Sequence, residues 1–314
     1  MKTNFNPVKD INLKSNMKTS EIINELSNSG GFMAKNLATG VEILVEMVNN
    51  KKCLKFLSFP AAPISTGLRG VFKEIIKRKL VDVIITTCGT LDHDIARCSN
   101  NYYEGDFNFD DDTVYKKGYH RLGNILIPID SYGPLLENKL QPFLSKIYDK
   151  GIKSMSTYEF TNSIGEHLNN SSSILYWAHK NNIPIIIPGI TDGAVGNQIW
   201  LFSQKHPDFK IDILKDEQLL SDLIFKAKNT GALMLGGGIS KHHTLWWNQF
   251  RGGLDYAVYI TTALEYDGSL SGAPVKEAVS WGKVKSKAKM VTINGEFTSL
   301  LPFMVSSLID QIKR

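Results

Sequence analysis

The chain has 314 residues, of which 42% are hydrophobic and 21% charged, a composition typical of a globular protein with a sizeable core. Its 36 lysines and arginines exceed its 31 acidic residues only slightly, and this thin excess argues against a nucleic-acid-binding surface. The three cysteines lack metal-ligand spacing, and no apolar run approaches the ~20 residues of a membrane helix. Since the N-terminus also lacks the apolar core of a signal peptide, we expect a cytoplasmic protein without metal, membrane or nucleic-acid partners.

The predicted elements alternate between short apolar strands and longer segments of helical period. Residues 1–18 form a polar N-terminal segment, and residues 19–314 are expected to form a single domain. In chain order, the expected strands are Leu54–Phe59, Val81–Thr86, Ile183–Ile187, Ala232–Leu235 and Tyr256–Ile260. The expected helices are Gly67–Lys79, Ser172–Lys180, Glu217–Lys228 and Ile239–Phe250. This alternation predicts a Rossmann-like α/β fold, with a mostly parallel sheet covered by helices on both faces.

The segment Asn100–Asp112 interrupts the alternation. It contains five acidic residues and shows no periodicity, so we expect an excursion on the protein surface. A solvated loop and a surface that grips a basic partner both fit this composition.

Small or polar residues follow nearly every expected strand. The segments are Pro60–Ser65, Thr87–Thr90, Gly189–Gly193, Gly236–Gly238 and Thr261–Ala263. In a parallel sheet such loops meet at the carboxyl edge of the strands, where ligands bind in open α/β folds. The sequence therefore predicts a nucleotide-sized ligand site at this edge.

The motif GGGISKHH joins a glycine-rich turn to an expected helix. Glycines allow close approach of the backbone to an anion, and a helix N-terminus offers N–H groups to it. A cofactor loop and a plain tight turn both remain open. His242 and His243 lie at the start of the helix, and because neighbouring helical residues point about 100° apart, we expect at most one of them to face a site.

The stretch EAVSWGK, Glu277–Lys283, combines an acid, an indole and a lysine. If it is helical, Glu277 and Trp281 share a face, and this pair suits an alkylammonium group. A lysine that enters such a cavity can lose its proton and become a nucleophile. A surface Glu–Lys pair beside a half-buried Trp is the other interpretation that the pattern allows.

The motifs GGGISKHH, DYAVYITTALEYDGSLSG and EAVSWGK, in this order and spacing, resemble the deoxyhypusine synthase family in its archaeal type. LYWAHKNNIPIIIPGITDGAVG and YHRLGNILIP are similar to further family motifs, and the likeness covers roughly residues 50–305. The resemblance implies an NAD-dependent transfer of the aminobutyl group of spermidine, through an enzyme imine. The acceptor would be a lysine of the translation initiation factor precursor that comes to carry hypusine.

The resemblance also assigns roles to residues and implies self-association as a homotetramer. Lys283 would be the nucleophile that forms the imine, and His242 would assist proton movement. The amine would be bound by Glu277, Trp281, Tyr259, Gly268 and Asp92. NAD would be held by Ser65, Thr87, Gly89, Asp192, Gly237, Thr262, Ala263, Asp267, Ser271 and Glu296.

The sequence departs from the family pattern around the amine. Asn197 and Leu270 stand where other members have an Asp that binds the amine, and Pro274 replaces an Arg. Ala61-Ala62 stands where eukaryotic members typically have Ser-Asn, and Asp92-His93 stands where they have a pair of acids. Each lost charge-assisted bond is typically worth ~1.5–3 kcal/mol, so Asp92 or Asp94 is a candidate to compensate.

Two other functions remain compatible with the sequence. A homospermidine synthase would pass the same aminobutyl group to putrescine. A catalytically silent NAD-binding partner subunit would transfer nothing, although the retention of Lys283, Glu277 and Trp281 argues against that reading.

Overall fold

The computed structural model describes residues 5–312. The chain divides into two compact units: unit 1 comprises the residues up to Leu57 and from Ile224 onward, and unit 2 comprises Ser58–Leu223. The single domain expected over residues 19–314 stays a prediction. The described part of the polar N-terminal segment, residues 5–18, contains neither helix nor strand and is mostly exposed, while residues 1–4 lie outside the description.

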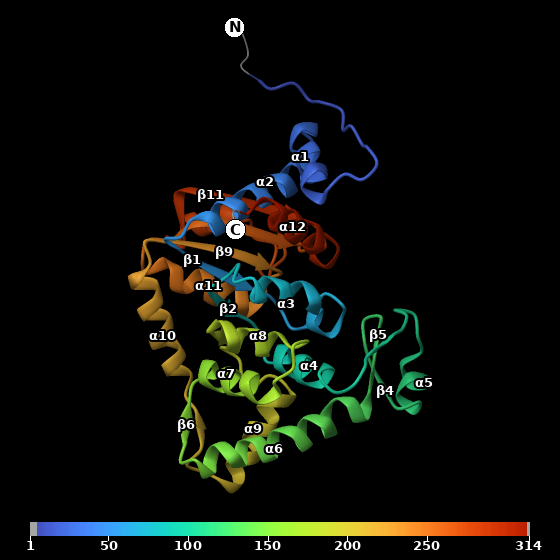
Figure 1. Ribbon diagram of the computed structural model, residues 1–314, viewed down its shortest axis with the longest axis vertical. Coiled ribbons are helices and arrows are strands. Elements are labelled where there is room, and N and C mark those ends of the chain that lie inside the picture. The colour runs from blue at the N-terminus through green and yellow to red at the C-terminus, as the bar shows by residue number, and fades with distance from the viewer. Residues whose placement is uncertain (1–4, 313–314) are drawn as a thin grey trace. The chain divides into compact units, whose positions relative to one another are not determined.

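Unit 1 contains a parallel sheet whose central strand is almost entirely buried. β10 (Leu254–Thr261) pairs in parallel with β9 (Asn229–Leu235) and with β11 (Val284–Asn294), and β1 (Cys53–Ser58) is next to β9. Helices cover both faces, which is why β10 is a nearly continuous apolar run. α2 and α12 lie on one face of these strands and α11 on the other (Figure 1).

The helices of unit 1 pack closely on the sheet. A Cβ added at Gly40 of α2 would lie 2.8 Å from Cδ1 of Ile293 on β11, so a larger residue there would separate helix and strand. The helical elements are α1 (Thr19–Ser29), α2 (Phe32–Asn49), α11 (Gly238–Gln249), η3 (Val275–Val279) and α12 (Phe297–Gln311), with α10 (Ile213–Lys226) crossing the boundary between the units.

Unit 2 contains the parallel pair β2 (Val83–Ile85) and β7 (Ile185–Ile186), both fully buried. Its helices pack closely, and a Cβ at Gly165 would lie only 2.2 Å from the backbone oxygen of Leu175. The remaining elements are η1 (Ala62–Ser65), α3 (Arg69–Lys77), α4 (Gly89–Arg97), η2 (Ile129–Ser131), α6 (Gly133–Asp149), β6 (Ser154–Met155), α7 (Thr157–Leu168), α8 (Ile174–Asn181), α9 (Ala194–Lys205) and β8 (Lys210–Ile211).

The strands confirm the predicted α/β fold. Unit 1 has its strands in the order β11-β10-β9-β1, with β10 parallel to both of its neighbours, and unit 2 has the parallel pair β2-β7. All five expected strands and all four expected helices are present, with ends shifted by a few residues. The sequence did not predict β11, the strand at one end of the sheet.

The acidic segment lies on the surface, as expected. It begins a small antiparallel sheet of β3 (Tyr103–Glu104), β5 (Ile125–Pro128) and β4 (Tyr119–Leu122) and leads into α5 (Asp111–Lys116). Two of its carboxylates have structural partners: Asp110 caps α5 by accepting from the Thr113 N–H at 2.8 Å, and Asp111 pairs with Arg121.

Candidate functional site

Five of the predicted site residues meet at one cavity of unit 1. The cavity has a volume of about 510 Å³, and it is lined by Lys283, His242, Glu277, Trp281 and Ser271. It lies between the N-terminal half of α11, the loop that precedes η3, η3 itself and the turn into β11. Residues more than forty positions apart in sequence thus line one cavity, and they include residues predicted to carry out catalysis and to bind the amine.

The backbone fixes Lys283 directly before β11, which begins at Val284. Gly282 has a φ of +67°, a left-handed conformation that favours glycine. The Lys283 N–H then donates to the Ala278 oxygen at 3.0 Å, and the Lys283 oxygen accepts from the Leu254 N–H at 3.0 Å. The side chain that leaves this anchored backbone brings its nitrogen to 5.1 Å from the Trp281 ring centre.

His242 is the histidine of the pair that faces the cavity, and His243 is not among the described lining residues. The imidazole stacks on Trp246, with ring centres 6.1 Å apart and planes 20° apart. Partial burial, and next the positive charge of Lys283, lower the pKa of His242 below its ordinary value. A neutral imidazole beside an amine can accept a proton from it.

Glu277 and Trp281 both line the cavity, but the backbone that carries them differs from the expected helix. They do not share the face of an α-helix, because η3 is a 3-10 helix that ends at Val279, and Trp281 follows in a turn. Trp281 is 67% exposed, so its ring can receive a ligand. Glu277 is the only acid among the described residues that line the cavity.

Lys241 is a lining residue that sequence reasoning missed. Its side chain is buried, with 8% exposure, and its nitrogen donates to the Ala273 oxygen at 3.1 Å. Burial lowers the pKa of Lys241 to about 8, although the charge of Glu277 acts in the opposite direction. The signal was available, because Lys241 lies one helical turn before the buried Leu245 on α11.

Tyr259 lies behind the cavity wall. It is fully buried on β10, its hydroxyl donates to the Ser271 oxygen, and it is not among the described lining residues. The family departures Leu270 and Pro274 do line the cavity. Asn197, another of the departures, is an exposed residue of α9 in unit 2.

The glycine turn before α11 fits the phosphates of a dinucleotide. Gly236 and Gly238 have φ values of +66° and +78°, and a Cβ at Gly237 would lie 2.4 Å from Oγ of Ser271. No side chain caps the N-terminus of α11, which leaves the backbone N–H groups of its first turn for an anion. The turn is therefore suited to a cofactor loop.

The loop after β10 carries further predicted site residues, among them Thr262, Ala263 and Asp267 for NAD and Gly268 for the amine. Thr262, Asp267 and Gly268 are exposed, and Ala263 donates its N–H to Oγ1 of Thr261 at 3.1 Å. Asp267 accepts from the Ser269 N–H at 3.2 Å, which shapes the loop. These positions are accessible to a ligand.

Glu296 has a different environment from the other predicted cofactor residues. Its carboxylate caps α12 by accepting from the N–H groups and hydroxyls of Thr298 and Ser299, at 2.5–2.9 Å. It lines a separate cavity of unit 1, of about 320 Å³, together with Met33 and Asn294. Its contact with NAD stays a prediction.

The loops that follow β1 and β2 lie against each other in unit 2, as predicted for a carboxyl edge. Oγ1 of Thr87 accepts from the Ala61 N–H at 3.1 Å, and a Cβ at Gly89 would lie 2.9 Å from Cβ of Ala61. Ser65 is buried and donates to the Ala62 oxygen at 2.7 Å.

Asp92 is buried and its carboxylate is fully engaged. It accepts from the Tyr132 hydroxyl at 2.7 Å and from the N–H groups of Ala194 and Val195 at 2.9 and 2.8 Å. It thereby caps α9, whose own N-cap residue, Gly193, has no side chain. This arrangement supports a structural role, and the predicted contact of Asp92 with the amine stays a prediction. Asp192, just before this helix, is exposed.

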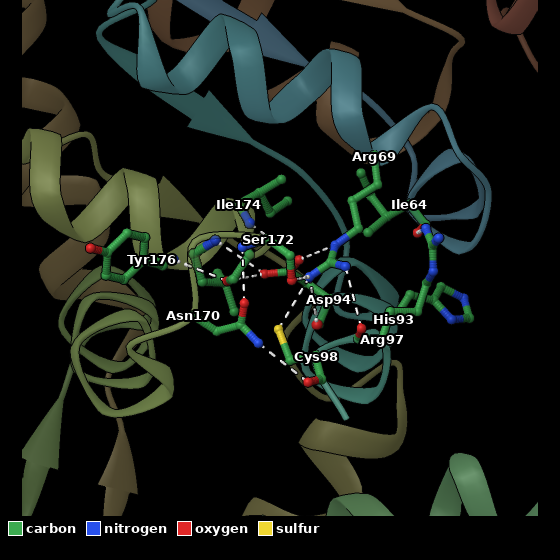
Figure 2. Close-up of polar contacts among 12 residues, drawn as sticks. Ile64, Arg69, His93, Asp94, Arg97, Cys98, Asn170, Ser172, Ile174 and Tyr176 are labelled. Atoms are coloured by element: carbon green, nitrogen blue, oxygen red, sulfur yellow. Dashed lines mark hydrogen bonds and ion pairs between the residues drawn. The ribbon is translucent and has the colours of Figure 1, made fainter. Parts of the chain in front are cut away.

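Asp94 is the hub of a buried polar network (Figure 2). It pairs with Nε of Arg69 at 2.6 Å and accepts from the Ser173 hydroxyl at 2.5 Å. The N–H groups of Ile174 and Leu175 also donate to it, so Asp94 holds the start of α8. A carboxylate with no exposed surface and four donors is poorly placed to bind an amine.

Among residues 5–312, no helix is long and apolar enough to cross a membrane. No cluster of three or more His, Cys, Asp or Glu residues suited to a metal ion occurs in the same described part of the chain.

Comparison with known proteins shows what this chain resembles. The family model for deoxyhypusine synthase matches residues 21–308. A protein of Picrophilus torridus named probable deoxyhypusine synthase is 55% identical over 303 residues, which is 96% of this chain and 97% of that protein. One of the same name from Thermoplasma acidophilum is 51% identical with the same coverage. An Entamoeba histolytica crystal structure, provisionally named deoxyhypusine synthase, has the same fold, with a TM-score of 0.67, 23% identity and 98% coverage of both chains.

Proposed function

This chain belongs to the deoxyhypusine synthase family of transferases, and we propose that it transfers the aminobutyl group of spermidine to a lysine of the hypusine-bearing translation initiation factor precursor. The observation that carries the proposal is the meeting of Lys283, His242 and Glu277 at one cavity. The relatives lend no support to a homospermidine synthase or to a silent partner subunit.

NAD is the cofactor that the family implies, and the glycine turn of unit 1 fits it. When bound, NAD accepts a hydride from the amine and returns it at the end of the reaction. Gly237 and the N-terminus of α11 would hold its pyrophosphate. Further contacts are proposed, from the family resemblance, for Thr262, Ala263, Asp267, Ser271 and Glu296 of unit 1 and for Ser65, Thr87, Gly89 and Asp192 of unit 2.

The residues of the cavity divide the amine chemistry among them. Glu277 pairs with an ammonium group of spermidine, and the exposed face of Trp281 packs on the alkyl chain beside it. His242, neutral because its pKa is lowered, accepts a proton so that an amine becomes nucleophilic.

Lys283 carries the aminobutyl group between donor and acceptor. Its neutral amine attacks the carbon of the oxidised substrate's C=N bond, and expulsion of 1,3-diaminopropane leaves an imine on Lys283. The acceptor lysine then attacks this imine carbon, and Lys283 leaves as a free amine. The new C=N bond on the acceptor is finally reduced to the secondary amine.

A homotetramer and a cytoplasmic location are further parts of the proposal. The family resemblance supports the tetramer. In the described part of the chain, no disulfide joins Cys53, Cys88 or Cys98, which supports a reducing compartment.

A label-transfer experiment tests the proposed function. The protein is mixed with NAD and spermidine labelled in its aminobutyl carbons, together with either the factor precursor or putrescine. We expect label on one lysine of the precursor, lost in Lys283→Ala and kept in Lys287→Ala, which changes an exposed lysine of β11, the strand that follows Lys283. Label found only in a putrescine product would identify a homospermidine synthase, and label in neither would favour the silent subunit.

A further inference from the structure

Two indole rings flank the nitrogen of Lys283. The Nζ atom lies 5.1 Å from the ring centre of Trp281 and 5.9 Å from that of Trp246. Both distances are within the ~6 Å over which a cation is attracted to an aromatic face. Both residues line the cavity, and they are 43% (Trp246) and 67% (Trp281) exposed to solvent.

Trp246 is held in place by its neighbours on α11. It stacks on His242, one turn before it, and meets Phe250, one turn after it, edge to face with ring centres 5.7 Å apart. Three aromatic rings at helical spacing thus form one stripe along the helix. A ring fixed on a regular helix between two others keeps its position better than a ring in a loop.

The cavity has few acidic side chains that could pair with a cationic substrate. Lys241, Lys283 and His242 line it with only one acid, Glu277, among the described lining residues. Leu270, another lining residue, adds no charge to the wall. A cationic substrate therefore meets few negative charges here, whereas two indole faces are available to it.

We propose that Trp246 and Trp281 form a two-walled aromatic site for the cationic nitrogen at Lys283, and that Trp246 is a specificity-determining residue for amines. This inference rests on the aminobutyl transfer proposed above. The neutral Lys283 amine bonds to the carbon of the protonated substrate imine, and the bond from this carbon to the diaminopropane nitrogen breaks. The products are a protonated imine on Lys283 and the neutral amine of 1,3-diaminopropane, so atoms and charge balance. A protonated imine retains only one N–H donor but keeps its positive charge, which an aromatic face attracts without a further hydrogen bond.

Fluorinated tryptophans at position 246 test the proposal. Fluorine withdraws electron density from the ring face and changes the shape of the ring little, so attraction for a cation falls stepwise with the number of fluorines. We expect the Kd for spermidine to rise along the series, by roughly 2- to 30-fold in total, and the borohydride-trapped imine on Lys283 to fall with it. Trp246→Leu, which keeps an apolar side chain, should match the most fluorinated variant.

Trp247 provides the matched control, because it is adjacent on α11 and is not among the described residues that line the cavity. The same fluorinated series at Trp247 should leave the Kd unchanged. A flat series at Trp246, or equal slopes at the two positions, would overturn the proposal. A graded Kd without any imine in the wild-type protein would support the aromatic site and reject the aminobutyl transfer, and an absence of spermidine binding would reject both.

Discussion

The side-chain nitrogen of Lys241 lies 3.6 Å from the centre of the Tyr259 ring. It donates at the same time to the Ala273 oxygen, so it joins α11 to the loop before η3. The cavity therefore has two lysines in different situations. Lys241 is held against the wall by a buried ring and a carbonyl, whereas the rings near Lys283 both line the cavity.

The buried position of Lys241 predicts an amine that titrates early. Because burial lowers its pKa to about 8, we expect Lys241 to reach half of its maximal reactivity near that pH. Competitive labelling with limiting acetic anhydride, followed by mass spectrometry of peptides, measures this midpoint. Exposed lysines ordinarily titrate near ~10.4, and a Lys241 midpoint in that range would show that its amine is solvated.

Glu277→Gln should both weaken amine binding and lower the pH at which Lys241 titrates. The carboxylate is the cavity's one acid in the described lining, so its loss should raise the Kd for spermidine roughly 10- to 100-fold. Because the charge of Glu277 raises the pKa of Lys241, the Lys241 midpoint should also fall.

Calorimetry gives the first quantity and competitive labelling the second. Glu46→Gln, which removes an exposed acid that pairs with Lys289, is the control and should change neither. If Glu277→Gln left both values as in the wild type, Glu277 would not face the ligand.

The Arg69–Asp94 pair should be essential for the stability of unit 2. Its side chains are 8% and 0% exposed, and removing one partner of a buried pair typically costs ~3–5 kcal/mol. Arg69→Met and Asp94→Asn should each lower the free energy of unfolding, measured in denaturant, by about that amount. Asp112→Asn, which breaks the exposed pair with Lys116, should cost no more than ~1 kcal/mol. An equal loss of stability in the Asp94 and Asp112 variants would contradict the proposed importance of the buried pair.

The lowered pKa of buried His93 predicts that the protein loses stability in mild acid. Burial, with a smaller contribution from the charge of Arg97, lowers its pKa from 6.5 to about 4. Between these values the unfolded chain binds the proton and the folded protein does not, so the free energy of unfolding falls as the pH falls through this window. The loss is on the order of 3 kcal/mol. In His93→Gln this dependence should disappear, and parallel pH profiles for variant and wild type would contradict it.

The sequence predicted the interior of the fold better than its edge. Buried strands such as β10 are continuous apolar runs, which the pattern reveals directly. β11 lies at one end of the sheet and carries partly or fully exposed lysines at positions 285, 287 and 289. An edge strand exposed in this way has no apolar alternation to recognise.

The site was predictable in its motifs and unpredictable in its long-range contacts. Lys283, His242 and Glu277 stand in recognisable motifs, and the structure brings them together. The sequence does not show that Trp246, about forty residues away, approaches Lys283. Nor does it show that Asp92 caps a helix that begins about a hundred residues later, because such a bond depends on tertiary packing.

The most direct test asks which lysine of the cavity forms the imine. Wild-type protein, NAD and spermidine are treated with borohydride, and the peptides that contain Lys241 and Lys283 are separated and weighed. The proposed transfer predicts an aminobutyl group on Lys283, none on Lys241, and no adduct in Lys283→Ala. An adduct on Lys241, or one that persists in Lys283→Ala, would contradict the central role of Lys283.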